Sequence, residues 1–219
     1  MSAALSSGAL RELTIGGDPP LTAILGVPDN ARGLVLFAHG SGSGRLSPRN
    51  NYVAQRLCEA GLATLLLDLL TPAEEADRRN VFNIDLLASR LERATDWAAS
   101  HAETADLPPC YFGASTGGGA ALRAAAGDPR IAAVVSRGGR PDLAGADVLA
   151  RVAAPTLLIV GELDGVVIEL NAVALDAMHC TKQMIIVPGA GHLFEEPGTL
   201  DQVVDHTKNW FRRQLGGRT

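Results

Sequence analysis

Short, almost entirely apolar segments recur along this chain, and amphipathic stretches of helical period separate them. The hydrophobicity of each segment is continuous rather than alternating, which is typical of strands that helices cover on both faces. The segments span residues 33–38, 63–67, 109–112, 131–136, 156–160 and 184–187. Because strands that alternate with helices are joined by right-handed crossovers, this order predicts an α/β fold with a mainly parallel sheet.

Two further strands are predicted ahead of these segments, at residues 11–15 and 21–27. The turn sequence Gly-Gly-Asp-Pro-Pro separates them, which favours an antiparallel pair. Helices are predicted at residues 51–60, 83–99, 116–126, 166–178 and 199–215. The whole set predicts a mostly parallel sheet of eight strands with helices on both faces, within one domain covering residues 1–219.

The composition argues against several classes of partner. The net charge is −5, and the chain holds only two lysines, Lys182 and Lys208, with no basic cluster. We therefore expect neither nucleic acid nor an anionic membrane surface as a partner. No window reaches the run of about 18 apolar residues that crosses a bilayer. Residues 1–10 lack the basic and then apolar pattern of a signal peptide.

The three cysteines, Cys58, Cys110 and Cys180, follow no paired spacing. Small buried thiols on strands and helices are common structural residues, so we expect none of the three to carry chemistry. This usage fits a reducing compartment, and the sequence therefore predicts a cytoplasmic protein.

The pentapeptide Gly-Ala-Ser-Thr-Gly at residues 113–117 matches the pattern G-x-S-x-G. It lies between a predicted strand and a predicted helix, which is the context of a nucleophile elbow. In an elbow the serine occupies a strained turn, and side chains at the two flanking glycines would collide with neighbouring strands. This context favours Ser115 as a nucleophile, and a plain glycine-rich turn is the alternative.

A serine hydroxyl is a weak nucleophile at neutral pH and needs a base, which a third group orients. Of the five histidines, His192 directly follows the last predicted strand and precedes the last predicted helix. His101 and His206 fall on polar helix surfaces, and His179 lies at a helix end. His192 is therefore the predicted base, and a loop histidine held by local hydrogen bonds is the alternative.

Two acidic residues follow the predicted strand at residues 156–160, in the sequence Gly-Glu-Leu-Asp-Gly. In the chain order serine, acid, histidine, the acid belongs in the loop after this strand. Asp164 is the predicted partner of His192 because it sits further into the loop and precedes a glycine. Glu162 is the fallback, and a simple Asp-Gly turn is the interpretation without catalysis.

An oxyanion that forms during acyl transfer needs two donors aimed at it. The N–H of Thr116, next after the serine, is the first candidate. Ser41 is the second, in the sequence His-Gly-Ser-Gly-Ser-Gly that follows the strand at residues 33–38. His39 is interpreted as a structural hydrogen-bonding residue. Phosphate binding by this loop is disfavoured because the loop lacks the Gly-Lys-Ser/Thr ending of a P-loop.

Eight strand-like segments, a serine elbow after the fifth, an acid after the seventh and a histidine after the eighth resemble an α/β-hydrolase over essentially the whole chain. The short connection between the sixth and seventh strands leaves room for no large lid domain, which is similar to the dienelactone hydrolase family. That family carries cysteine in the elbow where this chain has Ser115, so its lactone substrate and cysteine chemistry do not carry over. The resemblance implies esterase-type acyl transfer to water through an acyl-enzyme, with no metal or organic cofactor.

Arginines also lie near the predicted site. Arg137 follows the sixth strand, and Arg45 and Arg49 flank the glycine-rich loop. Arg137 can bind a substrate carboxylate as a fork. The equally weighted alternative is an ion pair of Arg137 or Arg140 with a nearby aspartate, which would hold the loop.

The leading functional prediction is a serine hydrolase that acts on a small-molecule ester, lactone or thioester. An acyltransferase using the same triad is one alternative. A hydrolase-like binding module is another, and such a module should have lost a member of the set Ser115, Asp164 and His192, all of which are present. The hydrophobic content of 47% also permits a homodimer.

Overall fold

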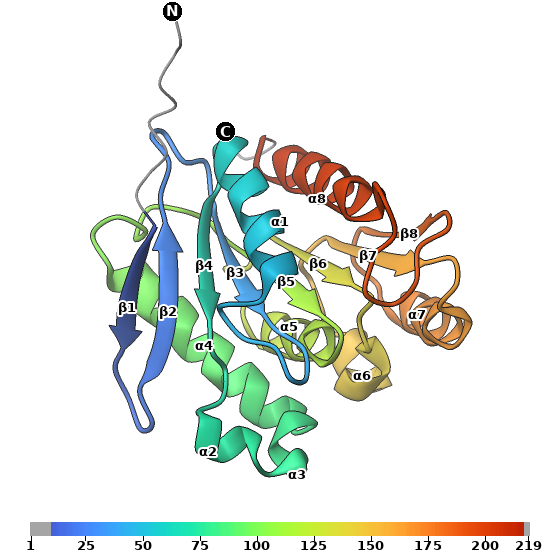
Figure 1. The fold of residues 1–219 in the computed structure, drawn as a ribbon, viewed down its shortest axis with the longest axis horizontal. Coiled ribbons are helices and arrows are strands. Elements are labelled where there is room, and N and C mark those ends of the chain that lie inside the picture. The colour runs from blue at the N-terminus through green and yellow to red at the C-terminus, as the bar shows by residue number, and fades with distance from the viewer. Residues whose placement is uncertain (1–9, 217–219) are drawn as a thin grey trace, which may run out of the picture.

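An eight-stranded sheet forms the centre of the computed structural model, which describes residues 10–216 (Figure 1). The strand order is β1-β2-β4-β3-β5-β6-β7-β8, and β2 pairs antiparallel with both β1 and β4, while all other neighbours are parallel. The strands are β1 (Arg11–Ile15), β2 (Leu21–Gly26), β3 (Leu34–Ala38), β4 (Ala63–Leu67), β5 (Pro109–Ala114), β6 (Ala133–Arg137), β7 (Thr156–Gly161) and β8 (Lys182–Val187). The predicted mostly parallel sheet and its antiparallel opening pair are confirmed.

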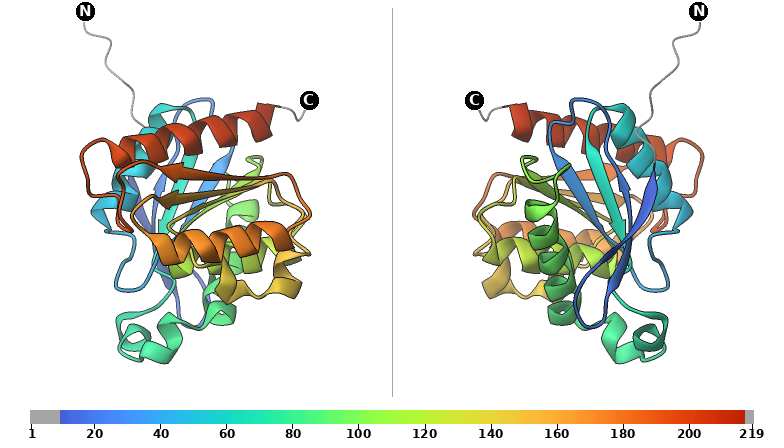
Figure 2. Two further views of the ribbon diagram at one scale, coloured as in Figure 1. Left: turned by 90° about the vertical axis from the view of Figure 1, so that its right-hand side faces the viewer. Right: turned by 90° about the vertical axis from the view of Figure 1, so that its left-hand side faces the viewer.

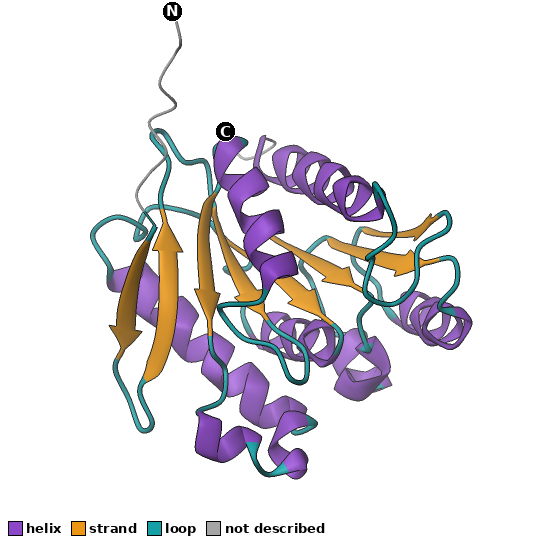
Figure 3. Cartoon of the chain, in the orientation of Figure 1, coloured by secondary structure: helices purple, strands orange, loops and turns teal. Residues whose placement is uncertain are grey.

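Helices cover both faces of the sheet, as Figures 2 and 3 show. On one face lie α1 (Pro48–Glu59) and α8 (Thr199–Gly216); on the other lie α4 (Ile84–Ser100), α5 (Thr116–Gly127) and α7 (Gly165–Ala177). Each face has its own apolar cluster of buried side chains, which include Leu57 and Trp210 on the first and Leu91 and Leu122 on the second. Burial on both faces explains the continuous hydrophobicity of β3 to β7. None of the helices within residues 10–216 has the length and hydropathy needed to cross a bilayer.

The first turn of α1 begins three residues earlier than predicted, and capping explains the difference. The Ser47 side chain accepts a hydrogen bond from the Asn50 N–H, and Pro48 occupies the first helical position. Proline suits this position because its missing N–H would have no partner there. The apolar period alone therefore located the middle of this helix but not its start.

Four short helical segments lie in connections where the sequence pattern predicts no helix. They are α2 (Pro72–Glu75), α3 (Arg78–Val81), the 3₁₀ turn η1 (Pro141–Ala144) and α6 (Ala146–Leu149). Four residues make barely one helical turn, too few to produce a visible apolar period. In Figure 1, α2 and α3 extend below the carboxyl ends of the central strands. The connection between β6 and β7 holds only η1 and α6, as expected for a chain without a large lid there.

Candidate active site

The predicted catalytic residues lie at the carboxyl ends of three parallel strands. Ser115 follows β5, Asp164 follows β7 and His192 follows β8. Ends of parallel strands share one edge of the sheet, where α/β proteins build their sites. The fold therefore places the three residues at the same edge, as their order in the sequence predicted.

The backbone at Ser115 is strained, with φ of 52° and ψ of −122°. A positive φ is uncommon for any residue except glycine, and it persists only where surrounding contacts hold it. Here the Ser115 N–H donates to the Arg137 carbonyl at 3.3 Å, and the Ser115 carbonyl accepts from Gly118 and Arg140. Although Ser115 stands at the cap position of α5, its side chain forms no capping bond, which leaves its hydroxyl available.

Glycine is required on both sides of the serine, for two different reasons. A Cβ at Gly117 would lie 2.1 Å from the Ala38 carbonyl oxygen, on the neighbouring strand β3. A Cβ at Gly113 would instead lie 2.4 Å from the Gly117 carbonyl oxygen, in the first turn of α5. The expected collision with a neighbouring strand is thus correct for Gly117 and wrong for Gly113, where the obstacle is the helix that the turn begins.

Substituting Gly117 by alanine is expected to destabilise the protein by at least about 2 kcal/mol, because rigid backbone blocks the added methyl group. Gly127 ends the same helix, and a Cβ there meets no atom within 4 Å. Gly127→Ala should therefore be neutral or stabilising by up to about 1 kcal/mol. Chemical denaturation of both variants measures the difference, and equal stabilities would contradict the proposed close approach.

Asp164, and not Glu162, contacts the predicted base. The Nδ1 atom of His192 lies 2.6 Å from the Asp164 Oδ2 atom. A carboxylate accepts, so Nδ1 carries the proton and Nε2 is left free to accept one. The Glu162 carboxylate instead accepts from the Gly189 N–H at 2.8 Å. The two acids therefore make different contacts: Asp164 contacts the imidazole, and Glu162 binds the backbone of the loop that carries it.

The loop of His192 is held by two contacts that the sequence did not indicate. The Glu196 carboxylate accepts from the Gly191 N–H at 3.1 Å, and this hydrogen bond lowers the pKa of Glu196. Phe194 has a φ of 55° and is only 2% exposed, in the apolar cluster under α1 and α8. A buried aromatic side chain two residues after His192 anchors the loop, and a strained backbone lets it turn inward.

Ser115 and His192 both lie next to the backbone at the end of β6. Among the described residues no hydrogen bond joins the Ser115 hydroxyl to the His192 ring. A Cβ at Gly138 would lie 3.6 Å from the His192 Cε1 atom, and Gly138 directly follows the residue whose carbonyl binds Ser115. Catalytic hydrogen bonds are often long without substrate and tighten when it binds.

The two predicted oxyanion donors border one small cavity. Gly40, Ser41 and Thr116 all line it, and a Cβ at Gly40 would lie 2.9 Å from the Ser115 Cβ atom. Within residues 10–216 neither the Ser41 nor the Thr116 N–H donates a hydrogen bond. His39 has the structural role that was expected, since its Nε2 accepts from the Leu69 N–H and its Nδ1 contacts the Gly40 carbonyl, both at 2.9 Å.

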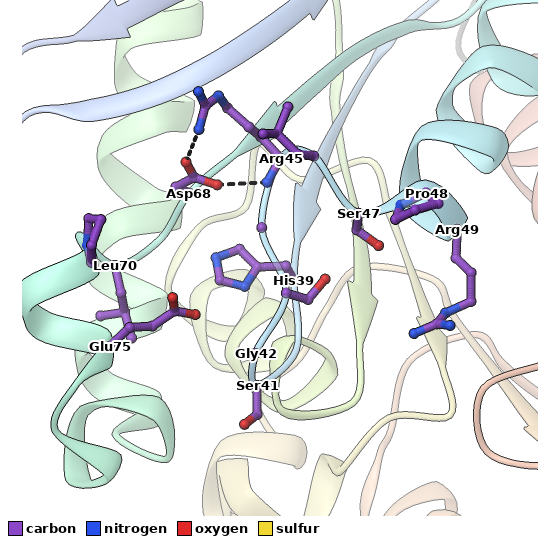
Figure 4. Close-up of a pocket in the computed structure, with 14 residues that line it drawn as sticks. His39, Ser41, Gly42, Arg45, Ser47, Pro48, Arg49, Asp68, Leu70 and Glu75 are labelled. Atoms are coloured by element: carbon purple, nitrogen blue, oxygen red, sulfur yellow. Dashed lines mark hydrogen bonds and ion pairs between the residues drawn. The ribbon is translucent and has the colours of Figure 1, made fainter.

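A pocket of about 500 Å³ opens beside the glycine-rich loop (Figure 4). Ser41 lines both this pocket and the small cavity, which links the pocket to the oxyanion donors. Its wall is about equally polar and apolar, with an Arg45–Asp68 ion pair on one side. Leu70, just before α2, and Glu75, the last residue of α2, also line it. The sequence pattern indicated no role for Glu75, because its segment has no apolar period.

Arg137 is buried, with 7% of its surface exposed, and its Nε and Nη1 atoms have no hydrogen-bond partner in the described part of the chain. The loop-holding ion pair belongs to Arg140, which binds Asp142 through two hydrogen bonds of 2.8 Å. Of the two interpretations of these arginines, the ion pair therefore applies to Arg140 alone. No group of three or more metal-ligating side chains with a suitable arrangement occurs among the described residues.

Comparison with known proteins identifies the family. Residues 31–212 match the alpha/beta hydrolase domain. A dienelactone hydrolase from Anabaena variabilis is 53% identical, with a TM-score of 0.91 over 94% of this chain and 97% of that protein. Est1E from Butyrivibrio proteoclasticus shares the fold at 17% identity, with a TM-score of 0.79 over 94% of this chain and 99% of Est1E.

Two curated relatives from strains of Mycobacterium tuberculosis are 60% identical over 205 residues and are named "Putative phosphoribosyl transferase". The match covers 93% of this chain and 46% of each relative, so the chain spans about half their length. The domain match and the Anabaena relative support a hydrolase-type enzyme. On both grounds, the chain belongs to the alpha/beta hydrolase family.

Proposed function

We propose that this protein is a serine hydrolase that cleaves small carboxylic esters, lactones or thioesters. The observation that carries the proposal is the 2.6 Å contact between His192 and Asp164, at the sheet edge where Ser115 occupies its strained turn. An acid on Nδ1 orients the imidazole, and a free Nε2 is what a serine nucleophile needs as its base.

The proposed reaction begins with attack of the Ser115 Oγ atom on the substrate carbonyl carbon. The hydroxyl proton passes to His192 Nε2, and the Asp164 carboxylate stabilises the resulting imidazolium. Negative charge on the carbonyl oxygen is met by the N–H groups of Thr116 and Ser41. The carbonyl re-forms as the bond to the leaving group breaks, and His192 returns its proton to the leaving-group atom.

Water then releases the acyl group from Ser115. His192 takes a proton from the water, whose oxygen bonds to the acyl carbon, and the same two N–H groups stabilise the second oxyanion. The ester bond to Ser115 breaks, and His192 gives its proton back to the serine oxygen. Acid, alcohol or thiol, and unchanged enzyme are the products. Side chains and water supply every proton and bond in this sequence.

Charged side chains in the pocket wall favour short acyl groups. A long acyl chain in this pocket would cover Asp68 and Glu75 without offering them hydrogen bonds, which costs binding free energy. In a series of 4-nitrophenyl esters, we expect kcat/KM for acetate and butyrate to exceed that for decanoate by about tenfold or more. A maximum at the decanoate would contradict this account of the pocket.

Labelling with a fluorophosphonate probe tests the proposal in one step. The probe should modify the wild-type protein at Ser115 and leave Ser115→Ala unmodified. Ser89→Ala is a matched control, because Ser89 is a serine on α4 whose hydroxyl bonds only the Leu86 carbonyl. Absence of labelling in the folded wild type would favour a binding module. Faster ester loss on adding an alcohol, with the transfer product formed, would favour the acyltransferase.

A further inference from the structure

Beside the His192 loop lie two arginines with unpartnered nitrogen atoms, the buried Arg137 and the partly exposed Arg49. Arg137 ends β6, and its guanidinium lies 6.0 Å from the ring centroid of Phe194. Arg49 comes from the first turn of α1 and binds the Glu195 carboxylate at 2.7 Å through Nη1. In Figure 4 its side chain extends from the start of α1 at one side of the pocket. The β6 end, the start of α1 and the histidine loop thus meet here.

The pair carries more positive charge than the protein neutralises. Within the described residues, Arg137 forms no ion pair, and three buried nitrogen atoms lack any hydrogen-bond partner: Arg137 Nε, Arg137 Nη1 and Arg49 Nε. Burial lowers the pKa of Arg137 to about 10, and repulsion by Arg49 adds to this effect. At neutral pH Arg137 still carries its charge. Burying a guanidinium without a partner is costly, and an anion that binds there recovers the cost.

We propose that Arg137 and Arg49 bind an anionic group, a carboxylate or a phosphate, on the leaving-group side of the substrate. Guanidinium N–H pairs match both anions in fork geometry. The leaving-group atom must receive its proton from His192, and the arginines pack against the loop that carries His192. This inference rests on the proposed serine hydrolase activity and adds the chemical class of its substrate.

Glu195 completes the site as an exchangeable partner. Its side chain is 63% exposed and touches Arg49 only through one ion pair, so a substrate anion can replace it. With Glu195 in place, the cluster of Arg137, Arg49 and Glu195 keeps one uncompensated positive charge. Removing the charge of Glu195 should therefore strengthen selection for an anionic substrate.

Two acetate esters with matched leaving groups test the site: 4-acetoxybenzoate, which carries a carboxylate, and its neutral methyl ester. The readout is kcat/KM for the carboxylate ester divided by kcat/KM for the neutral ester. This ratio does not depend on the fraction of folded enzyme. We expect Arg137→Gln to lower this ratio about tenfold or more. Arg140→Gln, which removes the ion-paired neighbour, should leave it unchanged. A ratio that Arg137→Gln leaves at the wild-type value would overturn the site.

Two further variants keep the test decisive if Arg137→Gln does not fold. Arg49→Gln should lower the ratio and Glu195→Gln should raise it, and a ratio unchanged in both contradicts the proposal. Ser115→Ala separates this inference from the proposed function. If Ser115→Ala still hydrolyses the neutral ester, the proposed function fails. If hydrolysis requires Ser115 but Arg137→Gln leaves the ratio unchanged, only the proposed anion site is contradicted.

Inhibition of neutral-ester hydrolysis distinguishes the two anions. The probes are 4-hydroxybenzoate and phenyl phosphate, which present a carboxylate and a phosphate on the same ring. The anion whose inhibition constant rises in Arg137→Gln, by about tenfold or more, is the one the site binds. Inhibition constants that the variant leaves unchanged for both compounds would show that Arg137 binds neither.

Discussion

Replacing Ser115 by alanine is expected to lower kcat/KM for a chromogenic ester by a factor on the order of 10⁴ or more. The variant loses only the hydroxyl oxygen, which bonds to no described residue, and it keeps the backbone bonds to Arg137, Gly118 and Arg140. Its thermal unfolding should therefore match that of the wild type, so that the loss reports on chemistry. Steady-state kinetics and a melting curve on the same preparation measure both.

The combination with His192→Ala sharpens this expectation. Nucleophile and base act as one unit, so the double variant should be no slower than Ser115→Ala alone. A Ser115→Ala enzyme with more than about a tenth of wild-type activity would exclude Ser115 as the nucleophile. A double variant whose loss equals the product of the two single losses would place His192 in another role.

The second large effect is expected at Asp164. Asp164→Asn should lower kcat by roughly 10³ to 10⁴, because an amide can hold the imidazole in the wrong tautomer. Glu162→Gln is the matched control two residues earlier. Its amide oxygen can still accept from the Gly189 N–H, so we expect it to retain most activity. The two variants are assayed side by side for kcat and stability. They compare the loss of the carboxylate that contacts His192 with the loss of the carboxylate that contacts the Gly189 N–H.

Equal losses of kcat in the two variants would mean that the position of the loop carrying His192 affects catalysis as much as the Asp164–imidazole contact does. A large loss in Glu162→Gln alone would reverse the assignment of the acid. Because both substitutions remove one negative charge at the same edge of the sheet, a general electrostatic effect cannot separate them. A larger loss in Asp164→Asn than in Glu162→Gln is therefore the result expected from the 2.6 Å contact that Asp164 makes with His192.

The sheet was predictable because strands buried on both faces consist almost entirely of apolar residues. Every residue of β3, β4 and β7 is buried, and the apolar runs that predicted these strands lie at nearly the same positions. The start of β8 was missed because Lys182 and Gln183 are exposed on an edge strand, where hydrophobicity is no guide. Strand ends placed the candidate residues in order, since each motif directly followed an apolar run.

The sequence could not show which side chains form hydrogen bonds or ion pairs with each other. Asp164 and Glu162 are two residues apart and chemically similar, and only the path of the β8–α8 loop separates their tasks. The same holds for Arg137 and Arg140, of which one has a carboxylate and the other has none among the described residues. Partners of this kind come from distant elements, so neither periodicity nor spacing encodes them.

The short helices α2 and α3 have a consequence for how the substrate range of this protein can change. A capping box between Thr71 and Glu74 and an ion pair from Glu74 to Arg90 on α4 hold the segment from outside the sheet. Leu70, Pro72 and Glu75 of this segment line the pocket but carry none of the proposed chemistry. Libraries that vary Leu70 and Glu75 can therefore change which substrates bind while the proposed catalytic residues stay the same. This makes the segment a suitable target for directed evolution of substrate range.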